Sequence, residues 1–143
     1  MPILNYTTKI PADQTIGELM AILRKHGARQ IMVSYDVETN LPEAISFHLP
    51  EPVRPAAFRL PAQVVGVQRT LIKENVPAKL RSREHATNVA WRILKDWIEA
   101  QLALVEANMA TLPQLLLAQG IMDDGKTLYE KITADRLLEG HVG

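Results

Sequence analysis

The spacing of apolar residues in this chain predicts one long helix over residues 82–109. Two apolar stripes recur there at intervals of three and four residues, which places them side by side along a helix. Ser82 suits the N-cap position, and Pro113 is expected to break the helical pattern. Because the polar wedge is narrow, we expect this helix to be buried on two sides or to meet a second subunit. The first stripe comprises Ala86, Ala90, Ile93, Trp97, Ala100 and Leu104, and the second comprises Trp91, Leu94, Ile98, Leu102, Val105 and Met109.

Alternating apolar and polar positions upstream of this helix predict a small sheet. The alternation covers residues 29–35 and 44–49, and a third short β-prone run covers residues 57–60. Short connections between the three runs favour an antiparallel meander. Residues 3–8 are also β-prone, so we expect a further edge strand there.

Helical patterns lie on both sides of the predicted strands. Residues 15–18 match the capping box Thr-x-x-Glu, which opens a helix that Gly27 ends. A second helix is expected over residues 62–75, between the sheet and the long helix. The same capping box recurs at residues 127–130 and opens a last helix that ends near Gly140.

These elements predict an α+β fold with the order α-β-β-β-α. A small three-stranded antiparallel sheet packs against helices, and a long C-terminal helix and a short final helix complete the chain. With 143 residues, the chain is expected to form a single domain over residues 1–143.

The composition is that of an ordinary globular protein and excludes several classes of chemistry. No apolar run approaches the ~18 residues of a membrane span, and the first residues do not resemble a signal peptide. The chain contains no cysteine, which excludes disulfides, thiolate chemistry and Cys-based zinc sites. We therefore expect a cytoplasmic protein without membrane contact.

The distribution of charge along the chain indicates a possible partner. The net charge is zero, yet residues 1–95 contain 13 Lys and Arg against 8 Asp and Glu, whereas residues 96–143 contain 3 against 8. Within the first part, residues 69–95 form a basic block with seven Lys and Arg against two Glu. Such a block attracts phosphates, or it pairs with the acidic segment within the fold or in a dimer. We expect nucleic-acid binding through backbone phosphates with little sequence selectivity. The candidate nucleic-acid-binding residues are Arg59, Arg69, Lys73, Lys79, Arg81 and Arg83.

Residues 120–127 match the phosphate-binding loop pattern G-x-x-x-x-G-K-[ST] letter for letter. Asp123 and Asp124, however, place two negative charges where phosphates would bind, and no convincing buried strand precedes the loop. The favoured interpretation is a turn closed by Gly125 and followed by a capped helix. ATP turnover that depends on Lys126 is the enzymatic alternative.

The other reactive side chains form no catalytic or metal-binding motif. No pair among the four histidines has the spacing of metal ligands, and no serine lies in a nucleophile motif. We therefore favour a non-enzymatic protein and expect no catalytic residue, cofactor or metal.

The two tryptophans of the long helix, Trp91 and Trp97, both fit the core, with base stacking as the alternative for Trp91.

Three segments of the chain resemble known proteins. They are Asn5-Tyr6-Thr7-Thr8, Phe58-Arg59-Leu60-Pro61 and, above all, residues 90–106 (AWRILKDWIEAQLALVE). On these segments the chain resembles a family of small phage, prophage and mobile-element proteins of unknown activity. The resemblance covers most of the chain and implies a mobile-element origin and a place of action in the cytoplasm of a bacterial host. It transfers no functional residue.

Two functions remain open at this point. The first is a nucleic-acid-binding accessory protein of a phage or mobile element, which uses the basic block. The alternative is a protein-interaction module, such as an inhibitor of a host defence or replication factor, which uses the broad apolar helix or its acidic end. The width of the apolar helix surface also predicts a homodimer.

Overall fold

A computed structural model describes residues 2–134. The three strands form one antiparallel sheet in the order β1-β2-β3, which confirms the predicted α+β fold. The elements in chain order are α1 (Ala12–Lys25), β1 (Arg29–Tyr35), β2 (Pro42–His48), β3 (Ala57–Pro61), α2 (Val64–Lys73), the 3-10 turn η1 (Ala78–Leu80), α3 (Arg83–Glu106), α4 (Leu112–Leu115) and the 3-10 turn η2 (Leu117–Gln119).

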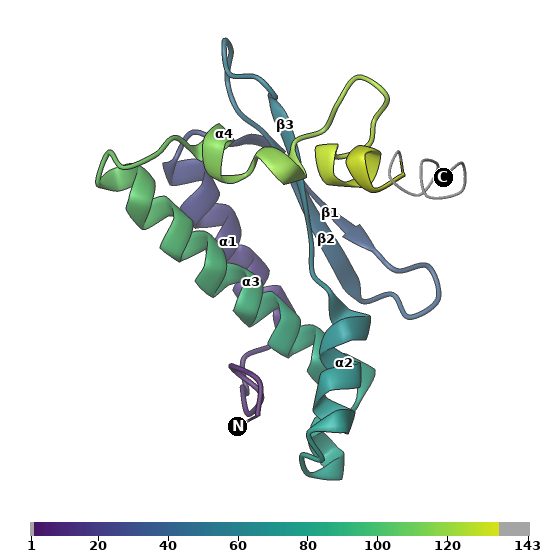
Figure 1. Ribbon diagram of the computed structural model, residues 1–143. Helices are drawn as coiled ribbons and strands as arrows, with labels where there is room; N and C mark the ends of the chain where they lie inside the picture. The colour runs from purple at the N-terminus through teal and green to yellow at the C-terminus, as the bar shows by residue number, and fades with distance from the viewer. Residues whose placement is uncertain (1, 135–143) are drawn as a thin grey trace.

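The sheet is covered by helices on one face. Figure 1 shows α1 and α3 side by side along this inner face, while α2 lies next to the beginning of α3. Strand register sends alternate residues inward, so Ile45 lies opposite Leu60 and Phe47 lies opposite Phe58. These four side chains are buried, and the two phenylalanine rings stack with their centroids 5.5 Å apart. The alternation seen in the sequence therefore marks the core face of the sheet.

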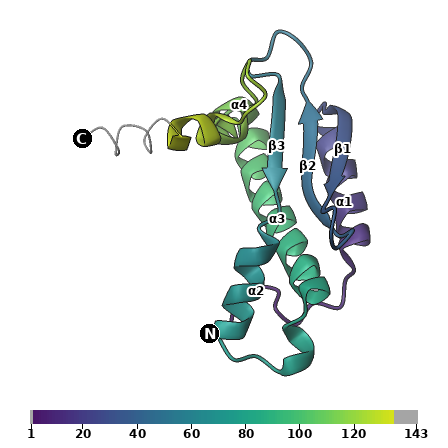
Figure 2. The same ribbon diagram turned by 90° about the vertical axis from the view of Figure 1, so that its right-hand side faces the viewer.

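The opposite face of the sheet is open in the part of the chain that the structure describes. Figure 2 looks onto this outer face, and no helix crosses the strands there. Ser46 and Arg59 are register partners on this face and are half-buried, whereas Met32 is exposed. Over residues 2–134, this outer face is therefore not covered by a helix.

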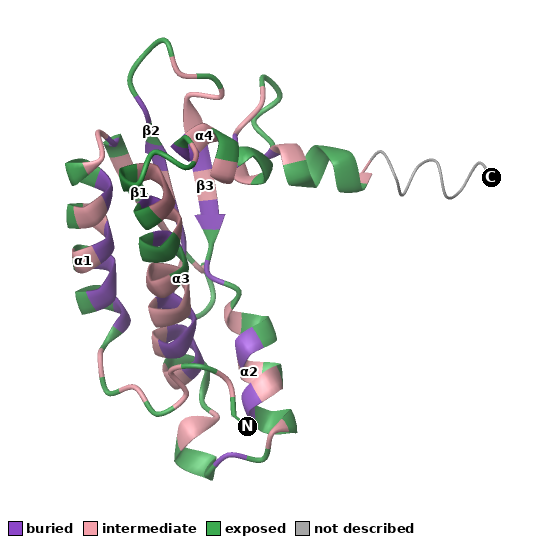
Figure 3. Cartoon of the chain, turned by 60° about the vertical axis from the view of Figure 1, so that its left-hand side comes forward, coloured by how far each residue is buried: buried purple, intermediate pink, exposed green. Residues whose placement is uncertain are grey.

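Helix α3 contributes buried residues to the core and also carries an apolar stripe that is only partly covered. Trp91 is fully buried, and its Nε1 donates a hydrogen bond to the Pro42 carbonyl oxygen at 3.0 Å. This burial excludes base stacking by Trp91. Trp97 is 36% exposed, so the expectation that both tryptophans belong to the core is wrong for Trp97. The reason is that α2 covers only the first half of α3, as Figure 3 shows.

The N-terminal segment is a turn and not the edge strand expected at residues 3–8. It lies against the helices through polar contacts. The Ile3 amide donates to Glu74 Oε2 at 2.7 Å, and Asn5 Nδ2 donates to Asp96 Oδ2 at 2.8 Å. These hydrogen bonds to residues far away in the chain hold the segment in place, so it does not need to pair with a strand.

Helix α1 begins one turn earlier than its sequence suggests. The predicted capping box at Thr15 and Glu18 is wrong, because Thr15 is buried inside the helix and Glu18 pairs with Arg92. An amide in the first turn of α1 has its acceptor in α3 instead, since Ala12 donates a hydrogen bond to Asn88 Oδ1 at 2.8 Å. At the other end Gly27, with φ of +94°, follows the last turn as predicted.

The ends of α3 follow sequence signals only in part. The Ser82 hydroxyl accepts the His85 amide at 3.0 Å, which confirms the predicted N-cap. The helix ends at Glu106, before the predicted break, and Pro113 lies in the first turn of α4. Residues 128–134 are helical, while the predicted helix end near Gly140 lies outside the described residues.

Candidate nucleic-acid interface

Four of the six predicted nucleic-acid-binding residues are exposed on the segment that runs from α2 to the start of α3. Arg69 and Lys73 are four residues apart, so they share the side of α2 that faces away from the buried Val67 and Leu71. We call the four exposed side chains the basic rim, and they are Arg69, Lys73, Lys79 and Arg83.

Arg81 is held by the connection between α2 and α3. Its Nε donates to the Val76 carbonyl oxygen at 2.5 Å, and its Nη2 donates to Asn75 Oδ1 at 3.0 Å. The side chain is also half-buried. These bonds hold the connection in place. They also occupy N–H donors of Arg81, so fewer of its donors are free for a phosphate than in the exposed side chains of the basic rim.

Arg59 is half-buried and lies on the outer face of β3, in another element than the basic rim. It lines a cavity of about 210 Å³ that Arg83 also lines, although 24 positions separate the two residues. We call this cavity the Asp36 cleft, and its charged residues are Asp36, Glu43, Arg59 and Arg83. The fold thus brings two of the predicted binding residues to one cleft.

The Asp36 cleft is electrically balanced. Asp36 Oδ1 accepts the Thr39 and Glu38 amides at 3.0 and 2.8 Å. The Thr39 amide, followed by that of Glu38, lowers the pKa of Asp36, and the nearby Arg83 charge contributes in the same direction. Because Asp36 stays ionised and Glu43 adds a second acid, the two arginines do not make this cleft positive by themselves.

The basic rim is not neutralised by the acidic C-terminal segment within residues 2–134. Arg83 Nε donates to the neutral Gln68 Oε1 at 2.6 Å. No ion pair in the described part of the chain involves any of the six predicted residues. The ion pairs there are Glu18–Arg92, Glu51–Arg54, Lys95–Glu99 and, when the histidine is protonated, His26–Glu106.

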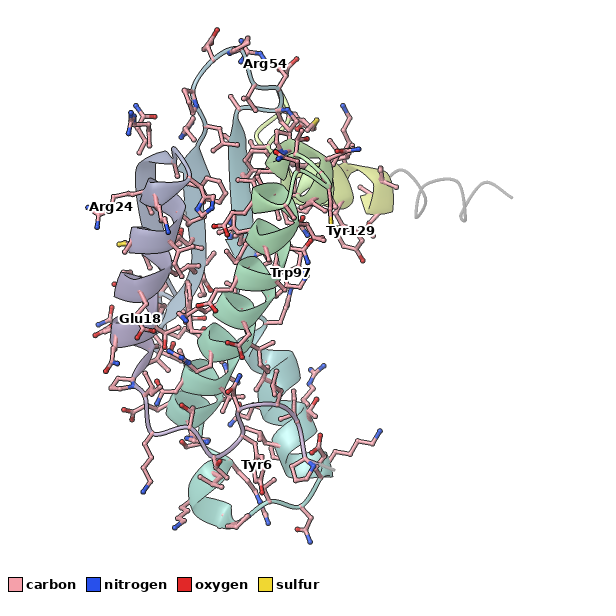
Figure 4. The ribbon with its side chains drawn as sticks, turned by 90° about the vertical axis from the view of Figure 1, so that its left-hand side faces the viewer. Tyr6, Glu18, Arg24, Arg54, Trp97 and Tyr129 are labelled. Atoms are coloured by element: carbon pink, nitrogen blue, oxygen red, sulfur yellow. The ribbon has the colours of Figure 1, made fainter. Side chains whose placement is uncertain are left out.

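A larger cavity of about 510 Å³ lies on the other side of Arg59. It is formed where the end of β3 meets η2 and the first turn of the last helix. We call this cavity the Tyr129 pocket, and its walls include Arg59, Pro61, Gln63, Gln119, Tyr129 and Glu130. Figure 4 shows the Tyr129 side chain on the helix that leads away from the body of the molecule.

Sequence reasoning missed the Tyr129 pocket, because Arg59 and Tyr129 are 70 positions apart and no motif joins them. The only local signal is the second capping box, which the structure confirms. Glu130 Oε1 accepts the Thr127 amide at 3.0 Å, and the Glu130 amide donates to Thr127 Oγ1 at 3.1 Å. The bonds with Thr127 lower the pKa of Glu130, and the Arg59 charge adds to this effect.

Residues 120–127 form a tight turn and do not surround an empty phosphate site. The Met122 amide donates to the Lys126 carbonyl oxygen at 2.8 Å, and the Lys126 amide donates to Asp124 Oδ1 at 3.0 Å. The Ile121 amide is bound to the Ala57 carbonyl oxygen on β3. Since these N–H groups already have partners, they are not presented to phosphates as a nucleotide-binding loop requires. This geometry matches the favoured interpretation, a turn followed by a capped helix.

Within residues 2–134, no group of three or more His, Asp or Glu side chains is placed to hold a metal ion. None of the helices described there is both long and apolar enough to span a bilayer.

The fold and its surface define an α+β protein with a sheet open on one face and an exposed basic rim beside it. Comparisons with protein-family models, curated proteins and solved structures gave no match for this chain.

Proposed function

We propose that the chain is a non-enzymatic nucleic-acid-binding accessory protein of a phage or other mobile element. It acts in the cytoplasm of the bacterial host and contacts the phosphate backbone with little sequence selectivity. The observation that carries this proposal is the basic rim, whose four side chains are exposed and form no ion pair in the described part of the chain, although Arg83 lies near Asp36. Exposed cations of this kind bind phosphates by releasing the counterions condensed on the nucleic acid.

The six predicted residues have different parts in this proposal. Arg69 and Arg83 offer planar guanidinium groups that can contact a phosphate through two N–H donors, whereas Lys73 and Lys79 act as point charges. Arg59 extends the contact onto the sheet, and Arg81 keeps the connection between α2 and α3 in place. Such contacts position a backbone and carry no sequence information of their own.

A binding titration at two salt concentrations tests the proposal. We expect labelled single- and double-stranded DNA and RNA to bind at about 50 mM salt and to lose most of their affinity at about 200 mM. The test variant replaces the four basic-rim residues by Gln. The matched control replaces four exposed basic residues on or near α1 and β1 by Gln, namely Lys9, Arg24, Lys25 and Arg29.

Three outcomes are informative. Loss of affinity in the basic-rim variant alone supports the proposal. An equal loss in both variants means that binding follows net charge, which contradicts a defined interface. No binding of any nucleic acid at micromolar protein and low salt overturns the proposed function.

A protein-interaction module is the second candidate, and one observation favours it. Trp97 is partly exposed just past the middle of α3, and Ile93 and Leu104 of the same stripe are also only half-buried. A partly uncovered apolar stripe is suited to a second copy of the chain or to a host protein. A monomeric mass in light scattering would contradict the homodimer, and a host partner retained at high salt would favour this candidate over nucleic acid.

A further inference from the structure

The Tyr129 pocket combines an available aromatic ring with an arginine. Tyr129 is 65% exposed, so its ring is not part of the core. The Thr127–Glu130 capping box fixes the helical turn that carries this ring. Arg59 is half-buried on the neighbouring strand and lines the same pocket. Aromatic rings and guanidinium planes are the two surfaces on which proteins stack unpaired bases.

The amide groups in the pocket offer hydrogen bonds of both kinds. Gln63 and Gln119 each carry a donor and an acceptor in the side chain. Neither side chain takes part in a hydrogen bond within the described residues, although both line the pocket. The edge of a nucleobase also presents donors and acceptors, and its size suits a cavity of about 510 Å³, which is in the range of small-molecule sites.

The charges in the pocket favour a base over a phosphate. Glu130 is kept ionised by its bonds with Thr127, and its negative charge opposes a phosphate inside the pocket. The same carboxylate can accept a hydrogen bond from an exocyclic amino group of a base. The adjoining phosphate is better placed outside both cavities, where Arg83 of the basic rim is exposed. Arg59 lies between, because it lines the Tyr129 pocket and shares the Asp36 cleft with Arg83.

We propose that the Tyr129 pocket takes an unpaired base of single-stranded nucleic acid, which stacks on the Tyr129 ring while Arg59 contacts the adjoining backbone. The protein then prefers single strands to duplexes, because the bases of a duplex are already stacked and cannot enter. This inference rests on the proposed function, since the basic rim supplies the attraction for phosphates.

The test compares intact and abasic single strands of the same length. Both carry the same phosphates, so the basic rim attracts them equally, and only the intact strand offers bases to the pocket. We expect the wild-type protein to bind the intact strand more tightly. Tyr129→Ala should remove that preference and weaken binding of the intact strand about 5- to 150-fold, the range known for base–aromatic stacking. Tyr129→Phe should retain the preference for the intact strand, because the aromatic ring remains.

A control variant and a second readout complete the experiment. Tyr35→Ala removes another exposed tyrosine, on β1, which lines neither cavity, and should leave the preference unchanged. In Tyr129→Trp, stacking of a base should quench the added indole fluorescence with the intact strand and not with the abasic strand. Circular dichroism of each variant confirms that the fold is retained.

The outcomes separate this inference from the proposed function. If intact and abasic strands bind the wild-type protein equally well, the pocket proposal is wrong while the proposed function stands. If Tyr129→Phe loses as much affinity as Tyr129→Ala, stacking on the ring is wrong. If neither strand binds at low salt, the proposed function fails and the pocket proposal fails with it.

Discussion

The basic rim and the Tyr129 pocket differ in what they can distinguish. The basic rim is a set of exposed charges on α2, η1 and the start of α3, and it lies largely outside the two cavities. The Tyr129 pocket holds one arginine, one acid, one ring and two glutamine amides around a cavity. Charges in water attract any polyanion and are screened by salt, whereas a shaped cavity distinguishes one chemical group from another. The two proposals thus assign affinity and selectivity to different parts of this molecule.

The largest expected effect comes from the core on which both regions depend. Trp91→Ala should lower the free energy of unfolding by about 3–5 kcal/mol, because it removes a fully buried ring and leaves a cavity. Urea denaturation followed by circular dichroism measures this loss. A loss below about 1 kcal/mol would contradict the role of Trp91 as the central core residue.

Replacing the basic rim should give the largest effect on binding. The four-residue Gln variant should weaken binding about 100-fold at about 50 mM salt and lower the salt slope by about 3, since each phosphate contact contributes just under one unit. Single and double strands should be affected alike. A loss confined to single strands would show that the rim does not act as a general phosphate contact.

Replacing Arg59 by Lys should act mainly on selectivity. The positive charge remains, so the salt slope should change little, while the planar group that contacts base or backbone is lost. We expect the ratio of single-strand to duplex affinity to fall about threefold to tenfold. An unchanged ratio together with a changed salt slope would assign Arg59 to the basic rim.

The smallest effect should come from the cap that positions Tyr129. Thr127→Ala should destabilise the helical turn by about 1 kcal/mol, because the Glu130 amide loses its acceptor. Hydrogen exchange of the amides in residues 128–134 measures this change. Single-strand preference should fall while the salt slope stays constant, and a constant preference would indicate that the ring does not need a fixed position.

Acid should weaken the same cap. The folded-state pKa of Glu130 is lowered from its ordinary 4.5, so its stabilising contribution is present above pH 4.5 and is lost as the pH falls through the lower folded value. The measurement is the protection of the amides in residues 128–134, that is, their hydrogen-exchange rate relative to the intrinsic rate at each pH. This protection should fall as the pH drops below 4.5, and Glu130→Gln should not show this pH dependence.

Local sequence signals predicted those elements whose partners are close in the chain. Ser82 caps α3, Gly27 follows α1, and Thr127 caps the last helix, because each bond joins residues only a few positions apart. The capping signal was wrong where a residue from a distant part of the chain binds the free amides of the helix. Thr15 does not cap α1, because Asn88 of α3 binds the first turn from outside.

The candidate site was predictable only in its charges. The basic block in the sequence contains the four residues of the basic rim, and the structure adds that they are exposed. The Tyr129 pocket gave no signal, because its walls come from β3, η2 and the last helix, which the chain brings together over some 70 positions.

The sequence by itself determined the α+β fold, the three strands and the buried face of the sheet, because hydrophobic periodicity is a local property. Tertiary structure decided that Trp91 is buried while Trp97 is partly exposed, and that Arg59 and Tyr129 line the same pocket. The physical reason is the same in each case. Whether an apolar stripe or a charge is covered depends on which distant element packs against it, and α2 covers only half of α3.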